Sequence, residues 1–207
     1  MNNEIVNFER LDLFWQYHNR ENPFLIVTTK IDITNVYKKC KNYYPALAYF
    51  ITLAVNKIDN FKYRYIQNRF YKFDKLNPSF TDIKPNKEIG FFRCDIDLKQ
   101  SYNSFLAKYK SIKEKFILTR ENITNLEENE IWFSCLPWFS FTSLIPPFDK
   151  NITIPQFIWD KFEIIDGKCY TNLMIMAHHG FVDGYHISLF LNELNDIISN
   201  IDKYLGD

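Results

Sequence analysis

The sequence has no surplus charge of either sign and no clustered cysteines. Lys and Arg together number 25, as do Asp and Glu, so the formal net charge is zero. A general nucleic-acid binder needs a basic surplus to displace counterions from phosphate, so we expect no nucleic-acid partner. Cys40, Cys94, Cys135 and Cys169 are far apart and form no C-x-x-C pair. Their spacing argues against structural zinc and favours reduced thiols.

A long hydrophobic run is also missing. The longest one, 43–55, is interrupted by Pro45 and Thr52 and is too short to cross a bilayer. The first residues lack the basic start and apolar core of a secretory signal. We therefore expect a soluble cytoplasmic protein with no membrane partner. No repeat, low-complexity tract or linker divides the chain, so residues 1–207 are expected to form one domain.

Aromatic residues, by contrast, are abundant: they make up 18% of the chain, including 20 Phe and 13 Tyr. Such rings can furnish a large core, an apolar pocket or a subunit interface. Hydrophobic periodicity predicts helices that alternate with strands, which favours an α/β or α+β class with a large sheet. The expected helices are 11–19, 45–58, 101–116 and a long closing one through 187–201. The expected strands are 24–33, two short ones within 63–74 around a turn at Gln67–Asn68, then 90–96, 132–144, 154–165 and 169–178, the last after a turn at Asp166–Gly167.

One segment differs in kind from the rest. The strand that begins near Thr171 runs directly into His178 and His179, and Asp183 follows shortly afterwards. Alternation along a strand places the two imidazoles on opposite faces, so at most one of them is expected to be reactive.

Three interpretations of this segment compete. The side chains can be satisfied polar groups at a strand end. A metal site built from His178, His179, Asp183 and His186 is disfavoured, because adjacent strand residues point apart and no H-E-x-x-H helix is present. In the third interpretation one histidine is a general base, because imidazole can take a proton from an attacking hydroxyl and return it later.

The motif H-H-x-x-x-D-G, at residues 178–184, is the signature of the coenzyme-A-dependent acyltransferase superfamily. The longer string HHGFVDGYH, followed by a long closing helix, resembles the chloramphenicol acetyltransferase family. Five more segments resemble that family in the same order: FERLDLF (8–14), TTKIDIT (28–34), YYPALAYF (43–50), FDKLNPSFT (73–81) and SCLPWFSFTS (134–143). The resemblance covers nearly the whole chain. It implies a two-layer sandwich, with helices packed on one face of a large mixed sheet.

The resemblance also implies roles for individual residues. The second histidine of the pair, His179, would be the general base. Ser134, in an S-x-x-P-W segment, would stabilise the oxyanion, with Ser140 and Ser143 as weaker candidates. Asp183 would pair with Arg10 and hold the loop that carries the histidine. Because a thioester is already an activated acyl donor, one base and one hydrogen-bond donor are enough to catalyse the transfer.

Substrates and assembly follow from the same resemblance. Tyr17 would contact the acyl acceptor. The family forms homotrimers with each active site between subunits, so His179 would come from one chain and most of the acceptor pocket from its neighbour. Acetyl-CoA would be a cosubstrate that enters from the opposite side, and no permanently bound cofactor or metal is expected. The sequence does not place the contacts with coenzyme A, for which Lys161 and Phe162 are weak candidates.

The sequence departs from the family pattern at four places, all of which bear on the acceptor. Ile158 stands where a threonine holds a water, and Gln16 where the pocket is usually aromatic. The stretch from Ser143 is shorter and richer in proline, and Met176 replaces a glutamine. The sequence thus predicts transfer of acetyl from acetyl-CoA to chloramphenicol. There are two alternatives. The protein can transfer acetyl to another small hydroxylated acceptor, or it can be a catalytically degraded trimer that only binds ligands.

Overall fold

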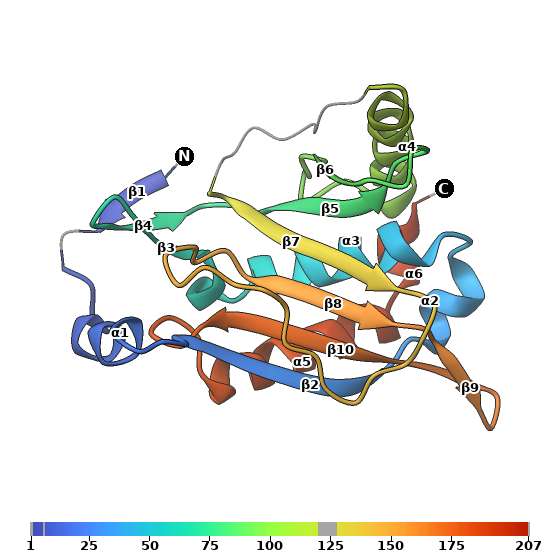
Figure 1. Ribbon diagram of the computed structural model, residues 1–207. Coiled ribbons are helices and arrows are strands. Elements are labelled where there is room, and N and C mark those ends of the chain that lie inside the picture. Colours follow the sequence, from blue (N-terminus) through green and yellow to red (C-terminus); the bar gives the residue numbers. More distant parts are fainter. Residues whose placement is uncertain (1, 6, 120–127, 207) are drawn as a thin grey trace.

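The computed structural model describes residues 2–5, 7–119 and 128–206. Its largest feature is a seven-stranded mixed sheet in the order β2-β10-β8-β7-β5-β6, with β9 paired to β10 (Figure 1). β7 runs parallel to both of its neighbours, and the remaining pairs are antiparallel. The strands are β2 (Phe24–Asp32), β5 (Asn77–Ile83), β6 (Ile89–Arg93), β7 (Glu130–Leu136), β8 (Gln156–Asp160), β9 (Glu163–Ile165) and β10 (Lys168–His178). A smaller sheet contains β1 (Asn2–Ile5), β4 (Arg69–Phe73) and β3 (Tyr63–Ile66).

Helices cover one face of the large sheet. The helical elements are α1 (Leu11–His18), α2 (Thr34–Lys39), α3 (Tyr43–Asn56), the 3-10 turn η1 (Asp59–Lys62), α4 (Tyr102–Leu118), α5 (Gly184–Ser199) and α6 (Asp202–Leu205). α3 and α5 pack against each other behind the strands, whereas α4 lies beyond β5 and β6 at the sheet's edge (Figure 1). This arrangement confirms the expected two-layer class. No helix among the described residues has the length and apolar character needed to cross a bilayer.

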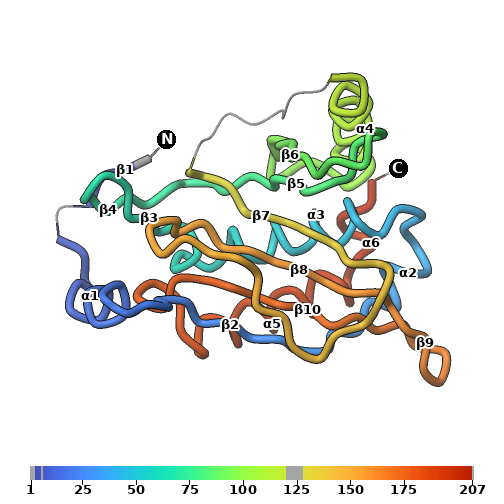
Figure 2. The backbone as a smooth tube through the Cα atoms, viewed as in Figure 1, coloured from blue at the N-terminus to red at the C-terminus, as the bar shows by residue number. Residues whose placement is uncertain are grey.

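The central strand β10 divides its side chains between two apolar clusters. Leu173, Ile175 and Ala177 belong to the main core under the helices. Met174 and Met176 lie on the opposite face, in a small cluster with Phe24, Ile26, Phe141, Leu144 and Ile158. The segment 137–155 crosses this second face (Figure 2). The alternation that was expected for the strand is therefore present along its length.

Most predicted elements are present, and the two predicted turns carry the backbone signature of tight turns. Gln67 and Asn68 have φ values of 48° and 64°, and Asp166 and Gly167 have 51° and 77°. Pro45 lies in the first turn of α3, where a missing N–H costs little.

Several predicted elements were too long, among them the strand expected at 90–96, which ends at Arg93. β7 ends at Leu136 rather than at 144, because Pro137 cannot donate to a strand ladder. The run 154–165 is two strands, since the Lys161 N–H donates to the Phe139 carbonyl instead of to a strand partner. The closing helix stops at Ser199, where the Asn200 side chain also bonds the Asp196 carbonyl. The strands β1 and β5 and the short helix α2 were not predicted; β5 contains Pro78, which argues against a central strand.

Candidate active site

His179 is the first residue after β10, and its ring is held by the turn that follows. The backbone N–H of His179 donates to the carbonyl of Pro23 at 2.8 Å. Its ring Nδ1 lies 3.1 Å from the carbonyl oxygen of Val182. Because a carbonyl only accepts, Nδ1 must carry the hydrogen, and the neutral ring then has its lone pair on Nε2. His179 as a whole is half-buried.

His178 has entirely different surroundings. It is 1% exposed, and its ring stacks on Phe14 with centroids 4.7 Å apart. The Gly180 N–H donates to its Nδ1 at 3.1 Å, and its Nε2 lies 3.4 Å from Nδ1 of His18. Burial lowers the pKa of His178 to about 3, and the nearby His18 and His179 act in the same direction. This histidine is a neutral structural group that holds the turn after His179.

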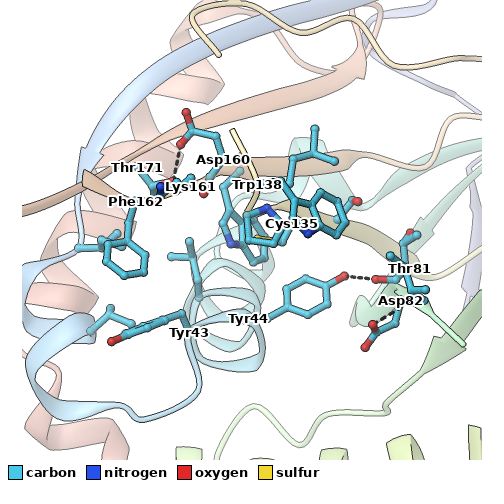
Figure 3. Close-up of a pocket in the computed structure, with 18 of the residues that line it drawn as sticks. Tyr43, Tyr44, Thr81, Asp82, Cys135, Trp138, Asp160, Lys161, Phe162 and Thr171 are labelled. Carbon is cyan, nitrogen blue, oxygen red and sulfur yellow. Dashed lines mark hydrogen bonds between the residues drawn. The ribbon is translucent and has the colours of Figure 1, made fainter. Parts of the chain in front are cut away.

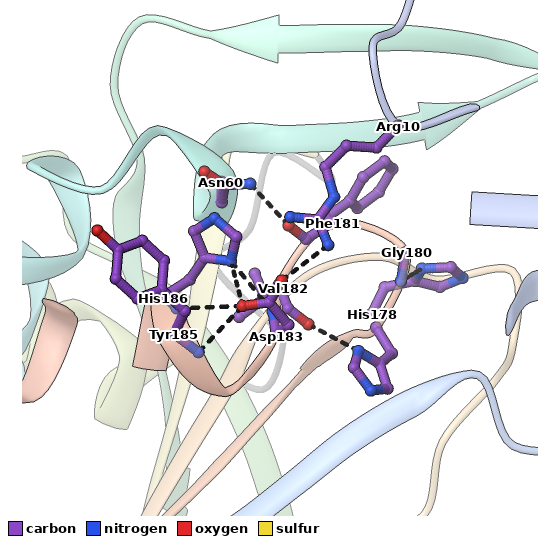
Figure 4. A network of polar contacts seen from close by, with 10 residues as sticks. Arg10, Asn60, His178, Gly180, Phe181, Val182, Asp183, Tyr185 and His186 are labelled. Atoms are coloured by element: carbon purple, nitrogen blue, oxygen red, sulfur yellow. Dashed lines mark hydrogen bonds and ion pairs between the residues drawn. The ribbon is translucent and has the colours of Figure 1, made fainter. Parts of the chain in front are cut away.

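Asp183 joins the turn to the last long helix and to the N-terminal region (Figure 4). As the N-cap of α5 it accepts hydrogen bonds from the N–H groups of Tyr185, at 3.0 Å, and His186, at 3.4 Å. Its other oxygen accepts from Nη2 of Arg10 at 3.1 Å. Burial opposes ionisation of this carboxyl, but the Arg10 hydrogen bond and the charges of His186 and Arg10 outweigh it and lower its pKa.

Helix α1 supplies a second contact to the candidate base. The Tyr17 ring stacks on His179, with centroids 3.9 Å apart and planes inclined by 21°. Gln16, the neighbouring residue on this helix, is exposed, and its carbonyl accepts from Nε of Arg20. The structure therefore brings Tyr17 and His179 together.

Ser134 lies on β7 between two cavities of about 450 Å³ each. Both cavities are also lined by Thr81. The first contains Lys161 and Phe162, the two residues considered for coenzyme A, and is lined further by Tyr43, Tyr44, Cys135, Pro137, Trp138, Trp159 and Asp160, among others (Figure 3). The second contains Ile158 together with Ser79, Phe91, Glu130, Trp132, Phe133, Pro146, Pro147 and Gln156. Ser140 instead donates to the Lys161 carbonyl at the surface.

One chain does not bring Ser134 and His179 together. Ser134 pairs with Ile158, which pairs with Met174 on β10. His179 is five residues beyond Met174. At a rise of about 3.3 Å per residue and about 4.8 Å between strands, the two groups are separated by on the order of 15–20 Å. His179 lines neither of these two cavities.

Within the described residues, no three His, Cys, Asp or Glu side chains are arranged to hold a metal ion. The nitrogens of His178 face Gly180 and His18, and Nδ1 of His179 faces Val182. These contacts favour the general-base interpretation of the motif over the metal one.

Known proteins resemble the chain along almost its full length. A profile of the family described as chloramphenicol acetyltransferase matches residues 2–195. The chain belongs to the chloramphenicol acetyltransferase family. A chloramphenicol acetyltransferase from Staphylococcus aureus is 32% identical over 217 residues, which cover 98% of this chain and 97% of the relative. The resemblance found in the sequence is confirmed, and with it the acyltransferase class.

Solved structures share the fold of this family member. A chloramphenicol acetyltransferase superposes with a TM-score of 0.82 at 22% identity, covering 96% of this chain and all of that chain. A truncated catalytic core of the 2-oxoacid dehydrogenase multienzyme complex from Thermoplasma acidophilum has a TM-score of 0.70 at 13% identity, over 96% and 99% of the two chains. The histidine motif is therefore set in the fold expected for it.

Sequence reasoning missed several residues of the two cavities. Thr81 closes the segment 73–81 that resembles the family, but that segment was not predicted as a strand and Thr81 was given no role. Gln156 and Asp160 flank Ile158 on β8 and follow no motif. Only their place in the sequence could have pointed to them, because both are polar residues at the ends of an otherwise apolar strand.

Proposed function

We propose that this chain is an O-acetyltransferase that moves an acetyl group from acetyl-CoA to a hydroxyl of chloramphenicol, with His179 as the general base. The observation that carries the proposal is the contact between Nδ1 of His179 and the Val182 carbonyl at 3.1 Å, which leaves Nε2 as a proton acceptor. It occurs in a chain 32% identical to a chloramphenicol acetyltransferase along almost its full length.

The reaction needs only this chain's own groups and two substrates. Nε2 of His179 takes the acceptor's hydroxyl proton as the oxygen attacks the thioester carbonyl. The carbonyl oxygen becomes negative and accepts a hydrogen bond from Oγ of Ser134, a contact worth about 3–4 kcal/mol of the barrier. The tetrahedral intermediate then collapses, the C–S bond breaks, and the leaving thiolate receives the proton from the imidazolium. No covalent enzyme intermediate is required.

The site requires two copies of the chain. Because Ser134 and His179 lie at different places on one sheet, a neighbouring copy must supply the base for each serine. We propose a cytoplasmic homotrimer of single-domain chains, with an active site at each subunit boundary and no permanently bound cofactor. Acetyl-CoA occupies the cavity lined by Lys161 and Phe162, and the acceptor occupies the cavity lined by Ile158. Ser134 stands between the two.

Thiol release tests the catalytic claim directly. Purified protein with acetyl-CoA and chloramphenicol should release free coenzyme A, detected with a disulfide dye, and His179→Ala should abolish the release. The kcat/KM of the wild type should fall toward acid pH, because a protonated imidazole has no lone pair. The claim is lost if wild type and His179→Ala release thiol equally slowly.

A different acceptor is the second candidate. The acceptor-side cavity combines the apolar Ile158 with the polar Gln156. The departures from the family pattern at Ile158, Gln16 and the stretch from Ser143 also bear on the acceptor. A panel of small alcohols separates the possibilities: turnover with one of them and none with chloramphenicol selects the second. Ligand-induced stabilisation without thiol release would instead indicate a binding protein.

A further inference from the structure

Asp160 is a buried carboxylate that the proposed mechanism does not use. It ends β8, is 3% exposed and lines the first cavity. Its Oδ1 accepts from Oγ1 of Thr171 at 2.9 Å and from the Asn172 N–H at 2.8 Å. Its Oδ2 accepts from Nδ2 of Asn172 at 2.7 Å and from the Phe141 N–H at 3.1 Å. Burying a charge is costly unless hydrogen bonds satisfy it, and here four donors do so.

Three of these bonds remain within neighbouring strands, but the fourth reaches another segment. Phe141 belongs to the segment 137–155 that crosses the sheet, four residues after Pro137. Two more contacts join the same places: the Lys161 N–H donates to the Phe139 carbonyl at 3.2 Å, and Oγ of Ser140 to the Lys161 carbonyl at 3.4 Å. The stretch 139–141 is thus attached to the end of β8 by three hydrogen bonds, of which only Asp160 contributes a charged acceptor.

This attachment sets one wall of the cavity. Pro137 and Trp138, which immediately precede the attached stretch, line it together with Lys161 (Figure 3). The side chain of Trp138 is 64% exposed, so burial alone does little to hold it. The position of this wall therefore depends on backbone contacts such as the one to Asp160.

We propose that Asp160 is a positioning residue for the acetyl-CoA cavity. By holding the Phe141 N–H, its carboxylate keeps Pro137 and Trp138 in place against Lys161 and so sets the KM for acetyl-CoA. This inference rests on the proposed function, because that function assigns the cavity to acetyl-CoA.

Asp160→Ala removes the anchor, and Asn172→Ala is its matched control. The control removes one donor to the same carboxylate on the strand side but leaves the bond to Phe141. We expect Asp160→Ala to raise the KM for acetyl-CoA about tenfold, the order expected for one hydrogen bond to a charged group. Its kcat and its KM for chloramphenicol should change little. Asn172→Ala should lower the melting temperature and leave the KM for acetyl-CoA unchanged.

Hydrogen exchange supplies a readout that does not depend on turnover. Amide exchange in a peptide containing Phe141 should be faster in Asp160→Ala than in wild type, and unchanged in Asn172→Ala. If Asp160→Ala fails to fold, Asp160→Asn keeps the side-chain size, and its KM for acetyl-CoA should rise in step with its exchange at Phe141.

Two outcomes overturn the inference: faster exchange at Phe141 with no change in KM, or an equal rise in KM in the Asn172→Ala control. Either outcome would mean that Asp160 has a structural role only. Absence of thiol release by the wild type would refute the proposed function instead, and with it the assignment of the cavity. The exchange experiment would still decide whether Asp160 anchors the segment.

Discussion

The ring of Tyr17 lies nearly parallel to the imidazole of His179, with the two centroids 3.9 Å apart. Helix α1 therefore limits rotation of the candidate base from one side, while the Val182 carbonyl fixes Nδ1. A stacked ring also shields part of the imidazole from solvent. Both effects come from the ring, and neither needs the phenolic hydroxyl.

Replacing Tyr17 separates these contributions. Tyr17→Ala should lower kcat/KM by up to about tenfold, because an aromatic pair is worth about 0.5–1.5 kcal/mol. Tyr17→Phe keeps the stacking and should stay close to wild type. Steady-state kinetics of the two variants give the comparison. A large loss in Tyr17→Phe would show that the hydroxyl contacts the acceptor, the role that the family resemblance implied.

Mixing two inactive variants tests whether sites form between chains. Ser134→Ala and His179→Ala each lack one essential group, but a site that takes His179 from one chain and Ser134 from its neighbour is complete. Co-expression should restore activity in about one site in four if subunits assemble at random. The measurement is thiol release by the mixed oligomer, with each homogeneous variant as control. Activity no greater than the mean of the two controls would mean that each site is built within one chain.

The lowered pKa of His178 predicts that the folded protein loses stability in acid. Its folded pKa is about 3, below the ordinary value of 6.5, so the unfolded chain binds a proton there before the folded chain does. Its contribution is fully present above pH 6.5 and is lost progressively as the pH falls toward 3. Urea unfolding at several pH values measures the slope of the free energy of unfolding against pH. His178→Gln, which does not titrate, should have a shallower slope, and an unchanged slope would assign the acid loss to other groups.

The Arg10–Asp183 pair should contribute to stability through the helix cap as well as through the charge. The two side chains are 21% and 35% exposed, so solvent screens part of their attraction. We expect Arg10→Met to cost about 1 kcal/mol. Asp183→Ala also removes the N-cap of α5 and should cost about 1 kcal/mol more. Thermal unfolding of both variants and of the double variant gives the coupling, and equal losses would mean that the cap is unimportant.

The cysteine thiols should be unreactive in the folded protein. Burial, with the carboxylates of Asp160 and Asp82, raises the pKa of Cys135 to about 12, although this residue lines the first cavity beside Ser134. Since only the thiolate is nucleophilic, iodoacetamide at neutral pH should leave Cys135 unmodified. Peptide mass spectrometry before and after denaturation in urea measures the difference. Rapid modification of the native chain would contradict a raised pKa at Cys135.

The histidine motif and the strand before it could be interpreted without coordinates. Period-two alternation separated Leu173 from Met174 and predicted different environments for His178 and His179, because successive strand residues face opposite sides. Local turn chemistry likewise predicted the reversal at Gln67–Asn68. Element ends were less accessible. β7 stops before Pro137, which cannot donate to the ladder, and α5 stops at Ser199, where the Asn200 side chain bonds the Asp196 carbonyl.

The amino-acid order alone indicated the family and the class of fold, because ordered local motifs and hydrophobic periodicity carry them. The candidate base and the candidate oxyanion donor followed from the resemblance to that family. Only the tertiary structure decided that Tyr17 covers His179, that Ser134 divides two cavities, and that Asp160 holds the segment crossing the sheet. These contacts join residues from distant parts of the chain, and their geometry depends on strand register and packing. The separation of Ser134 from His179 has the same origin: the two motifs are readable one by one, but their distance follows from how β7, β8 and β10 pair.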